Sequence, residues 1–166
     1  MREMTEEELT RRGEVVSAAM MEIGTTEEPA NSNKCKYNKW FYTKDTAAAW
    51  CSTFVCWCFN EAGIPIKGGD WLRGFASVPN FKKARKSEII NTPRPGDIVI
   101  FEFNGKPEPD HIGIFDHWIE EGKTFKCIEG NTSSKGSQDN GGIVLNQTRS
   151  IKLVDCFISP KEYTHT

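Results

Sequence analysis

The fold is decided by residues 50–63, which read WCSTFVCWCFNEAG. Apolar residues recur here at helical spacing, at Cys51, Val55, Cys58 and Ala62, and Gly63 is typical of the position that ends a helix. We therefore expect a helix with one apolar stripe facing the interior. Cys51 stands at its start, where unpaired backbone N–H groups and the positive end of the helix dipole favour a thiolate. A thiolate attacks carbonyl carbons, so this position suits a nucleophile.

The cysteines also allow structural interpretations. Free cysteine is among the most buried residue types, so an apolar helix with three of them can simply belong to the core. The spacing of the six cysteines does not resemble a small secreted disulfide framework. The chain also has no C-x-x-C pair, which is the usual sign of a zinc site. We expect reduced thiols, and the choice between a core helix and a catalytic helix depends on the rest of the chain.

Length and composition indicate one soluble globular domain of 166 residues. The net charge of −2 gives no sign of a nucleic-acid partner. The first residues, MREMTEEE, are acidic, and no apolar run follows them, so we expect no signal peptide and synthesis in the cytoplasm. No stretch is long and apolar enough for membrane insertion, and we expect a monomer.

The N-terminal segment has the pattern of an amphipathic helix. Thr5 and Glu8 have the spacing of a capping box. Five residues then recur at helical spacing before Gly24, and they predict the face that packs on the domain: Leu9, Gly13, Val16, Met20 and Ile23.

Residues 25–46 are polar and irregular, with aromatic side chains between Asn and Lys. One interpretation is a wall of a substrate groove, with Tyr37, Asn38 and Trp40 contacting substrate together with Trp50. The alternative is a loop pinned by its own aromatic side chains, and the sequence does not decide between them.

Oxygen-bearing side chains in the same segment raise the question of calcium. Asn31, Asn33 and Asp45 are candidate ligands, since oxygen ligands at nearby loop positions suit that ion. The segment lacks a carboxylate-rich loop, so we expect a protein that requires no cofactor.

The second half of the chain reads as strands. A short helix is expected at 77–81, and the turn signal TPRPGD at 92–97 then begins a region of strands on close loops, which indicates an antiparallel sheet. The expected strands are residues 98–103, 111–117, 124–129, 143–149 and 151–158. Helices first and strands after give an α+β fold with an antiparallel sheet of about five or six strands. The loop 131–142 is expected to edge the active site.

A histidine and a glutamate complete a possible catalytic set. His111 begins one expected strand and Glu129 ends the next, so in a hairpin both lie at the same end of the sheet. Glu129 would then orient one ring nitrogen of His111 while the other faces Cys51, which is the arrangement of nucleophile, base and orienting group. Gly113 shares a strand face with His111 and leaves space there for the approaching helix end.

Elimination supports His111 as the base. The chain has three histidines. His165 lies at the C-terminus, and His117 lies at the far end of the same strand face as His111. The structural alternative is that His111 is only a hydrogen-bonded residue at a strand end.

Four segments together resemble CHAP domains, the cysteine, histidine-dependent amidohydrolases and peptidases. They are WCSTFVCW at 50–57, PGDIV at 95–99, DHIGI at 110–114 and EGNT at 129–132. The resemblance covers about residues 10–159 and implies a papain-like fold that cleaves an amide of bacterial peptidoglycan. It implies Cys51 as nucleophile, His111 as base and Glu129 as orienting group, with Asn131 at a further polar position. The calcium loop of some phage lysins is not clearly reproduced.

The resemblance leads to an expected function. We expect a thiol hydrolase of peptidoglycan, either an N-acetylmuramoyl-L-alanine amidase or a stem or cross-bridge endopeptidase, acting on the cell wall after release or delivery as a phage or prophage endolysin. The oxyanion donors would be the backbone N–H of Cys51 and a group from residues 31–42, with Tyr37 as candidate. The alternatives are an injected antibacterial amidase effector, an amidase for small conjugates such as glutathionylspermidine, and a catalytically silent wall-binding domain.

Overall fold

The computed structural model describes residues 2–69, 71–134 and 141–165. Its helices are α1 (Glu6–Met20), α2 (Lys36–Tyr42), α3 (Cys51–Glu61) and α4 (Val78–Ala84), with short 3₁₀ turns η1 (Lys86–Glu88), η2 (Ile151–Leu153) and η3 (Lys161–Tyr163). Its strands are β1 (Ile89–Ile90), β2 (Ile98–Phe101), β3 (His111–Glu120), β4 (Thr124–Thr132), β5 (Ile143–Ser150) and β6 (Val154–Ile158). The strands form one sheet in the order β1-β6-β2-β3-β4-β5 with antiparallel neighbours. The expected α+β fold is confirmed.

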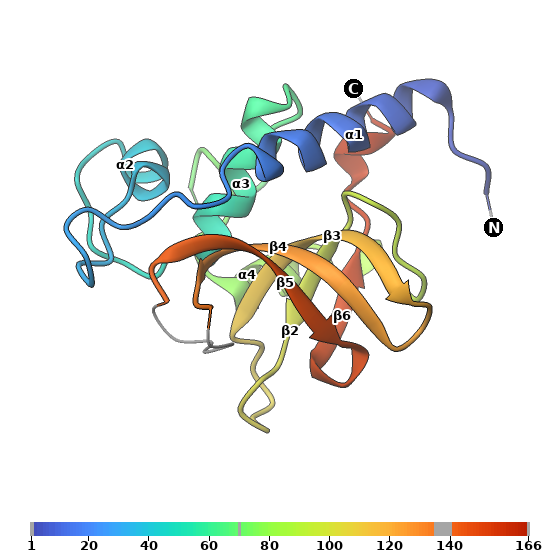
Figure 1. Cartoon of the computed structure of the whole chain (residues 1–166). Coiled ribbons are helices and arrows are strands. Elements are labelled where there is room, and N and C mark those ends of the chain that lie inside the picture. The colour runs from blue at the N-terminus through green and yellow to red at the C-terminus, as the bar shows by residue number, and fades with distance from the viewer. Residues whose placement is uncertain (1, 70, 135–140, 166) are drawn as a thin grey trace.

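The sheet has apolar side chains on both faces. Helices α1 and α3 lie together on one side of it, and α2 lies beyond the end of the sheet where β4 finishes and β5 starts (Figure 1). On the helix side, Ile98, Ile112 and Ile128 belong to the larger core. Alternate residues such as Phe101 and Phe115 form a second core on the other face. The two-residue period of a strand therefore decides which side of the sheet each side chain joins.

Helix α3 is buried almost all round, which corrects the expected single apolar stripe. Ser52, Thr53 and Cys56 are buried as well as Cys51, Val55 and Cys58 of the stripe, while Ala62 is partly buried just beyond the helix. The reason is that α3 packs against the sheet on one side and against α1 and α2 on the others. Gly63 follows the helix with a φ of 78°, as expected for a residue just beyond a helix end.

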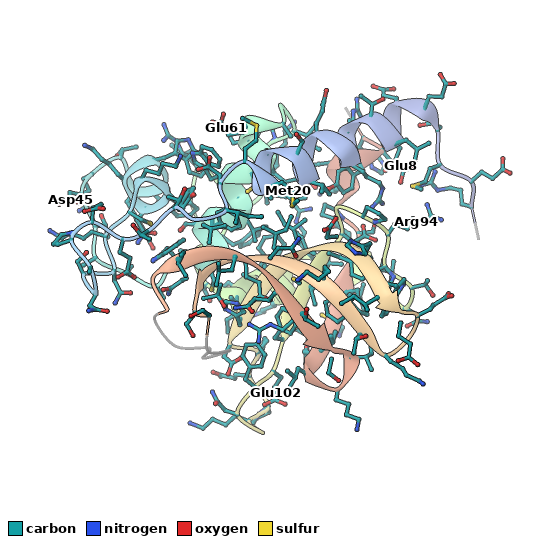
Figure 2. The ribbon with its side chains drawn as sticks, in the orientation of Figure 1. Glu8, Met20, Asp45, Glu61, Arg94 and Glu102 are labelled. Carbon is teal, nitrogen blue, oxygen red and sulfur yellow. The ribbon has the colours of Figure 1, made fainter. Side chains whose placement is uncertain are left out.

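Helix α1 buries a different face from the one expected. Its buried residues are Glu8, Arg12, Val15 and Ala19, whereas Leu9, Met20 and Ile23 are exposed. Polar residues occupy this face because Arg12 reaches the buried carboxylate of Asp97 at 2.7 Å and also bonds Glu8. An apolar pattern cannot reveal a face that is held by buried ion pairs. Glu8 is labelled on α1 in Figure 2.

The remaining differences concern short elements. Residues 36–42, expected to be irregular, form α2, and β1 is a two-residue strand with too few residues to show a pattern. The last expected strand starts later, because residues 151–153 form the 3₁₀ turn η2. The expected capping box forms only in part: Thr5 accepts a hydrogen bond from the backbone N–H of Glu8, while the Glu8 carboxylate bonds Arg2 and Arg12. Among the described helices, none has both the length and the apolar character to cross a membrane.

Candidate active site

Cys51 is the first residue of α3 and is 8% exposed. Trp50, the residue before it, is fully buried, and its indole N–H donates to Glu27 at 2.9 Å. This bond fixes the chain where it enters the helix. The sulfur therefore lies at a helix N-terminus, as the sequence predicts, on a backbone anchored from the preceding residue.

The amide of Asn38 holds the loop that leads to Cys51. Its Nδ2 donates to the carbonyls of Ala48 at 2.8 Å and Asn33 at 3.2 Å. Its Oδ1 accepts from the hydroxyl of Thr53 at 2.8 Å. Because Asn38 is fully buried, these bonds form where water does not compete with them. One side chain of α2 thus connects the loop with the first turn of α3.

His111 and Glu129 meet at one end of the sheet. Strands β3 and β4 are antiparallel neighbours with Ile114 opposite Ile128, and His111 Nε2 lies 2.7 Å from Glu129 Oε1. The expected contact between these two side chains is confirmed. The side chain of Cys51 is close enough to His111 to raise the pKa of its imidazole. Since Nε2 faces Glu129, Nδ1 is the ring nitrogen left for the sulfur.

The surroundings of His111 and Glu129 favour the charged form of each side chain. Burial lowers the pKa of His111, but the charge of Glu129 and hydrogen bonding of the ring to Cys51 and Glu129 outweigh it and raise the pKa to about 10. Burial raises the pKa of Glu129, but hydrogen bonds from Arg149 and the charge of His111 bring it below its ordinary value. At neutral pH the imidazole is therefore an imidazolium and the carboxyl is a carboxylate.

Two glycines make room around the group, and one of them corrects an expectation. A Cβ at Gly113 would lie 2.5 Å from the Cys127 sulfur and 2.7 Å from Glu129 Cγ, so this space is filled by β4 rather than by the helix. A Cβ at Gly130 would lie 2.6 Å from Phe54 Cβ. Gly130 is therefore the glycine that admits α3, because residues 129 and 130 point to opposite faces of the sheet.

Arg149 is a residue of this site that the sequence analysis did not find. From β5 its Nε donates to Glu129 Oε2 at 2.8 Å and its Nη2 to Glu129 Oε1 at 2.5 Å. The only signal in the sequence was the alternation of side chains along a strand. It puts Arg149 on the same face as Leu145 and Gln147, opposite the face of Val144. Which carboxylate it bonds depends on the register of β5 against β4, and the sequence does not supply that register.

The predicted groove wall is corrected for three of its four residues. Tyr37, Asn38 and Trp50 are fully buried, so they have no surface to offer a substrate. The hydroxyl of Tyr37 donates to Glu22 at 2.8 Å, which removes it as the expected oxyanion donor, and its ring stacks on Trp50. Trp40 is partly exposed and lies against the guanidinium of Arg73 at 5.2 Å.

The structure places Asn131 beside the loop between β4 and β5, and it places His117 and His165 at the surface. Asn131 is buried with a φ of 52°, and its Oδ1 accepts from the backbone N–H of Gly142 at 3.4 Å, which links the two ends of the loop between β4 and β5. Residues 135–140 of that loop lie outside the described residues. A bulge between Phe115 and His117 changes the strand alternation, which corrects the shared face expected for His117. His117 and His165 are both exposed.

The calcium candidates are Asn31, Asn33 and Asp45, and two of them make contacts within the protein. Asp45 lies at the periphery of the molecule beside α2 (Figure 2), and its carboxylate pairs with Lys34 at 3.0 Å. Asn31 and Asn33 both have left-handed backbone conformations, and the carbonyl of Asn33 is occupied by Asn38 and Ala48. Within residues 2–69, 71–134 and 141–165, no group of three His, Cys, Asp or Glu has metal-binding geometry.

Taken together, a thiol, an imidazolium and a carboxylate lie close together at the end of the sheet, with His111 bonded to Glu129 and near Cys51. That arrangement supports nucleophilic attack by sulfur with proton transfer through the imidazole. All six cysteines are free thiols. A family model described as the CHAP domain matches residues 42–131, more than half of the chain, and the match includes Cys51, His111 and Glu129. No curated protein matches the chain.

Proposed function

The chain belongs to the CHAP-domain family of amidases and peptidases, and from this membership we propose that it cleaves an amide bond of bacterial peptidoglycan with Cys51 as nucleophile. The observation that carries the proposal is the chain of contacts from Cys51 through His111 to Glu129. Three separate elements supply these residues: α3, β3 and β4. A helix-start thiol, a buried imidazole and a buried carboxylate are thus brought together from segments far apart in the sequence.

The proposed reaction begins with attack by the thiolate of Cys51 on the scissile carbonyl carbon. The carbonyl oxygen becomes an oxyanion, and the backbone N–H of Cys51 is its first donor. His111, an imidazolium at neutral pH, gives its proton to the leaving amine as the C–N bond breaks and a thioester forms. Neutral His111 then takes a proton from water, the resulting hydroxide attacks the thioester, and release of the acid restores the thiolate–imidazolium pair.

Glu129 has a supporting task in this reaction. It contacts Nε2 of His111, so it does not touch the substrate in this scheme. Its charge stabilises the imidazolium and its position keeps Nδ1 directed at the sulfur. Asn131 stays a candidate for the further polar residue near His111. In this scheme it acts by fixing the conformation of the loop that follows Glu129. Trp40 is the remaining candidate for contact with substrate.

Purified peptidoglycan tests the proposal directly. Wild type should release soluble muropeptides, and Cys51→Ala should lose activity by a factor on the order of 10³ or more. Cys35→Ala, which removes a partly buried thiol outside the site, is the matched control and should remain active. Equal solubilisation by wild type and Cys51→Ala would overturn the proposal.

Mass spectrometry of the products identifies the bond. A free L-alanine amine on intact stem peptides indicates an N-acetylmuramoyl-L-alanine amidase, and a new terminus within the stem or cross-bridge indicates an endopeptidase. A parallel assay on small amides such as glutathionylspermidine separates the alternative substrate class. If the wild-type protein cleaves neither peptidoglycan nor the small amides, the result would instead favour a catalytically silent wall-binding domain.

We further propose that the protein acts as a phage or prophage endolysin, as a monomer, after it reaches the wall. The injected-effector alternative predicts a neighbouring immunity gene, whereas an endolysin predicts a neighbouring holin gene. Expression inside a susceptible host adds a second measurement. An endolysin should lyse the cells only when a membrane-permeabilising protein is co-expressed, and an effector should be neutralised by its immunity partner.

A further inference from the structure

We propose that Arg149 is a positioning residue of this site, which holds the Glu129 carboxylate charged and fixed in rotation so that one oxygen stays directed at His111. The inference rests on the proposed thiol hydrolysis. Arg149 bonds both carboxylate oxygens, through Nε to Oε2 at 2.8 Å and through Nη2 to Oε1 at 2.5 Å. Oε1 is also the oxygen that lies 2.7 Å from His111 Nε2. A two-point grip of this kind prevents the carboxylate from turning about its last bond.

The guanidinium and the imidazole rest on the same aromatic pair. Arg149 lies over the rings of Phe101 and Phe103, with its guanidinium carbon 5.5 Å and 5.0 Å from their centroids. The ring of His111 lies against the same two rings, at 5.8 Å and 5.5 Å. A shift of Arg149 would therefore disturb the surface on which His111 packs as well as the carboxylate between them.

Charge balance gives the second reason. Glu129 is fully buried and His111 is 1% exposed, so a net charge in this cluster would be costly. During catalysis Cys51 and Glu129 are negative and His111 is positive, which leaves one negative charge. Arg149 supplies the positive charge that makes the set neutral. Without it, the cheapest way to remove the excess charge is to protonate Glu129 or the thiolate, and either change weakens the nucleophile.

The other titratable groups that face the cluster do not provide this balance. Cys127 reaches Glu129 from β4, and burial raises the pKa of its thiol, so it is a neutral donor at physiological pH. Asp110 lies before β3, close enough to favour protonated His111, and it is exposed and negative. Among the described groups around Glu129 and His111, Arg149 is therefore the one that carries a permanent positive charge.

The test uses Arg149→Met and Arg149→Lys in the full chain. Met keeps an apolar stem on Phe101, and Lys keeps the charge but loses the two-point grip. The matched control is Arg85→Lys, since buried Arg85 grips Glu162 in the same way outside the site. We expect Arg149→Met to lower kcat at neutral pH by about 10- to 100-fold with KM within about threefold, and Arg149→Lys to recover part of the loss. Arg85→Lys should leave kcat and its pH profile unchanged.

A second readout does not depend on activity. Carbon-detected NMR in a Cys51→Ser background follows the titration of the Glu129 carboxyl and the His111 ring. In Arg149→Met the Glu129 carboxyl should titrate about one pH unit or more above its position with Arg149 present, with Arg149→Lys in between. If wild type does not cleave peptidoglycan, the proposed function fails while this comparison still decides the role of Arg149.

The contrary results are equally specific. Unchanged titration of Glu129 and His111 in both variants overturns the proposal, as does kcat within twofold of wild type. Loss of activity that only follows the folded fraction, with the pH profile unchanged, assigns Arg149 a structural role and also overturns it. If Arg149→Met does not fold, the titration of Arg149→Lys decides.

Discussion

Nε2 of His111 lies 2.7 Å from Oε1 of Glu129, and that one contact determines which ring nitrogen is left for Cys51. It also contributes to the charge of the ring, because the carboxylate together with Cys51 outweighs the effect of burial on the His111 pKa. A change at Glu129 should therefore affect both the orientation and the charge of the imidazole.

Glu129→Gln tests this dependence. The amide keeps the shape of the side chain but loses its charge, and its NH₂ group favours the wrong ring tautomer when it faces Nε2. We expect kcat to fall by a factor on the order of 10³ or more, and the alkaline limb of the pH–rate profile to move to lower pH. Glu162→Gln, which alters a buried carboxylate paired with Arg85, is the control and should retain its pH profile. A kcat within tenfold of wild type in Glu129→Gln would contradict the assigned role.

The raised pKa of His111 makes the stability of the protein depend on pH. In the folded protein His111 stays protonated to a pH of about 10, whereas its ordinary pKa is 6.5. Between these values the folded state binds more protons than the unfolded state, so the contribution is complete below pH 6.5 and is lost as the pH rises through about 10. Urea unfolding at pH 7 and pH 10.5 measures it. The midpoint should fall more for wild type than for His111→Asn, and equal falls would contradict the shift.

Cys51 should react faster than the two more exposed cysteines, Cys35 and Cys156. Burial is the main cause that raises the pKa of Cys35 to about 11 and that of Cys156 to about 12, so these partly exposed thiols are protonated at neutral pH. Cys51 is less exposed but lies beside the imidazolium of His111, which is the setting in which reactive cysteines occur. Brief treatment with iodoacetamide at pH 7, followed by peptide mapping, should label Cys51 first. In His111→Asn that preference should disappear, and uniform labelling of wild type would argue against an ion pair.

Two glycine substitutions should change stability in opposite directions. Gly130→Ala places a methyl group 2.6 Å from Phe54 Cβ, so α3 must move away from the sheet, and we expect a loss of about 2 kcal/mol in the free energy of unfolding. Gly13→Ala adds a methyl group to an exposed helix position with nothing within 4 Å, and we expect a gain of about 0.5 to 1 kcal/mol. Thermal and urea unfolding measure both. Gly130→Ala should also lower activity, because the same displacement moves Cys51 relative to His111.

The positions of Cys51, His111 and Glu129 were predictable from sequence because each residue has a local signal. Cys51 starts a helix with a clear C-terminal stop, and His111 and Glu129 stand at strand ends joined by a short hairpin. Antiparallel pairing of neighbouring strands then requires the two side chains to lie at the same end of the sheet. No knowledge of distant contacts was needed for that step.

The predictions of surface positions for Tyr37 and Asn38 and of the buried face of α1 were wrong for a common reason. Tyr37 and Asn38 look like surface residues because polar atoms accompany them, yet those atoms bond partners such as Glu22 and Ala48 in the interior. Arg12 likewise looks exposed until Asp97 is placed beside it. Whether a polar side chain is buried depends on a partner that is distant in sequence, and a local pattern contains no information about that partner.

Asn38 takes no part in the proposed chemistry, yet its amide makes the loop before Cys51 and the first turn of α3 one rigid unit with α2. Exposed positions of α2, such as Lys39, can therefore change in size and charge without displacing the sulfur. In this scaffold, surface changes on α2 are thus decoupled from the geometry of Cys51 and His111.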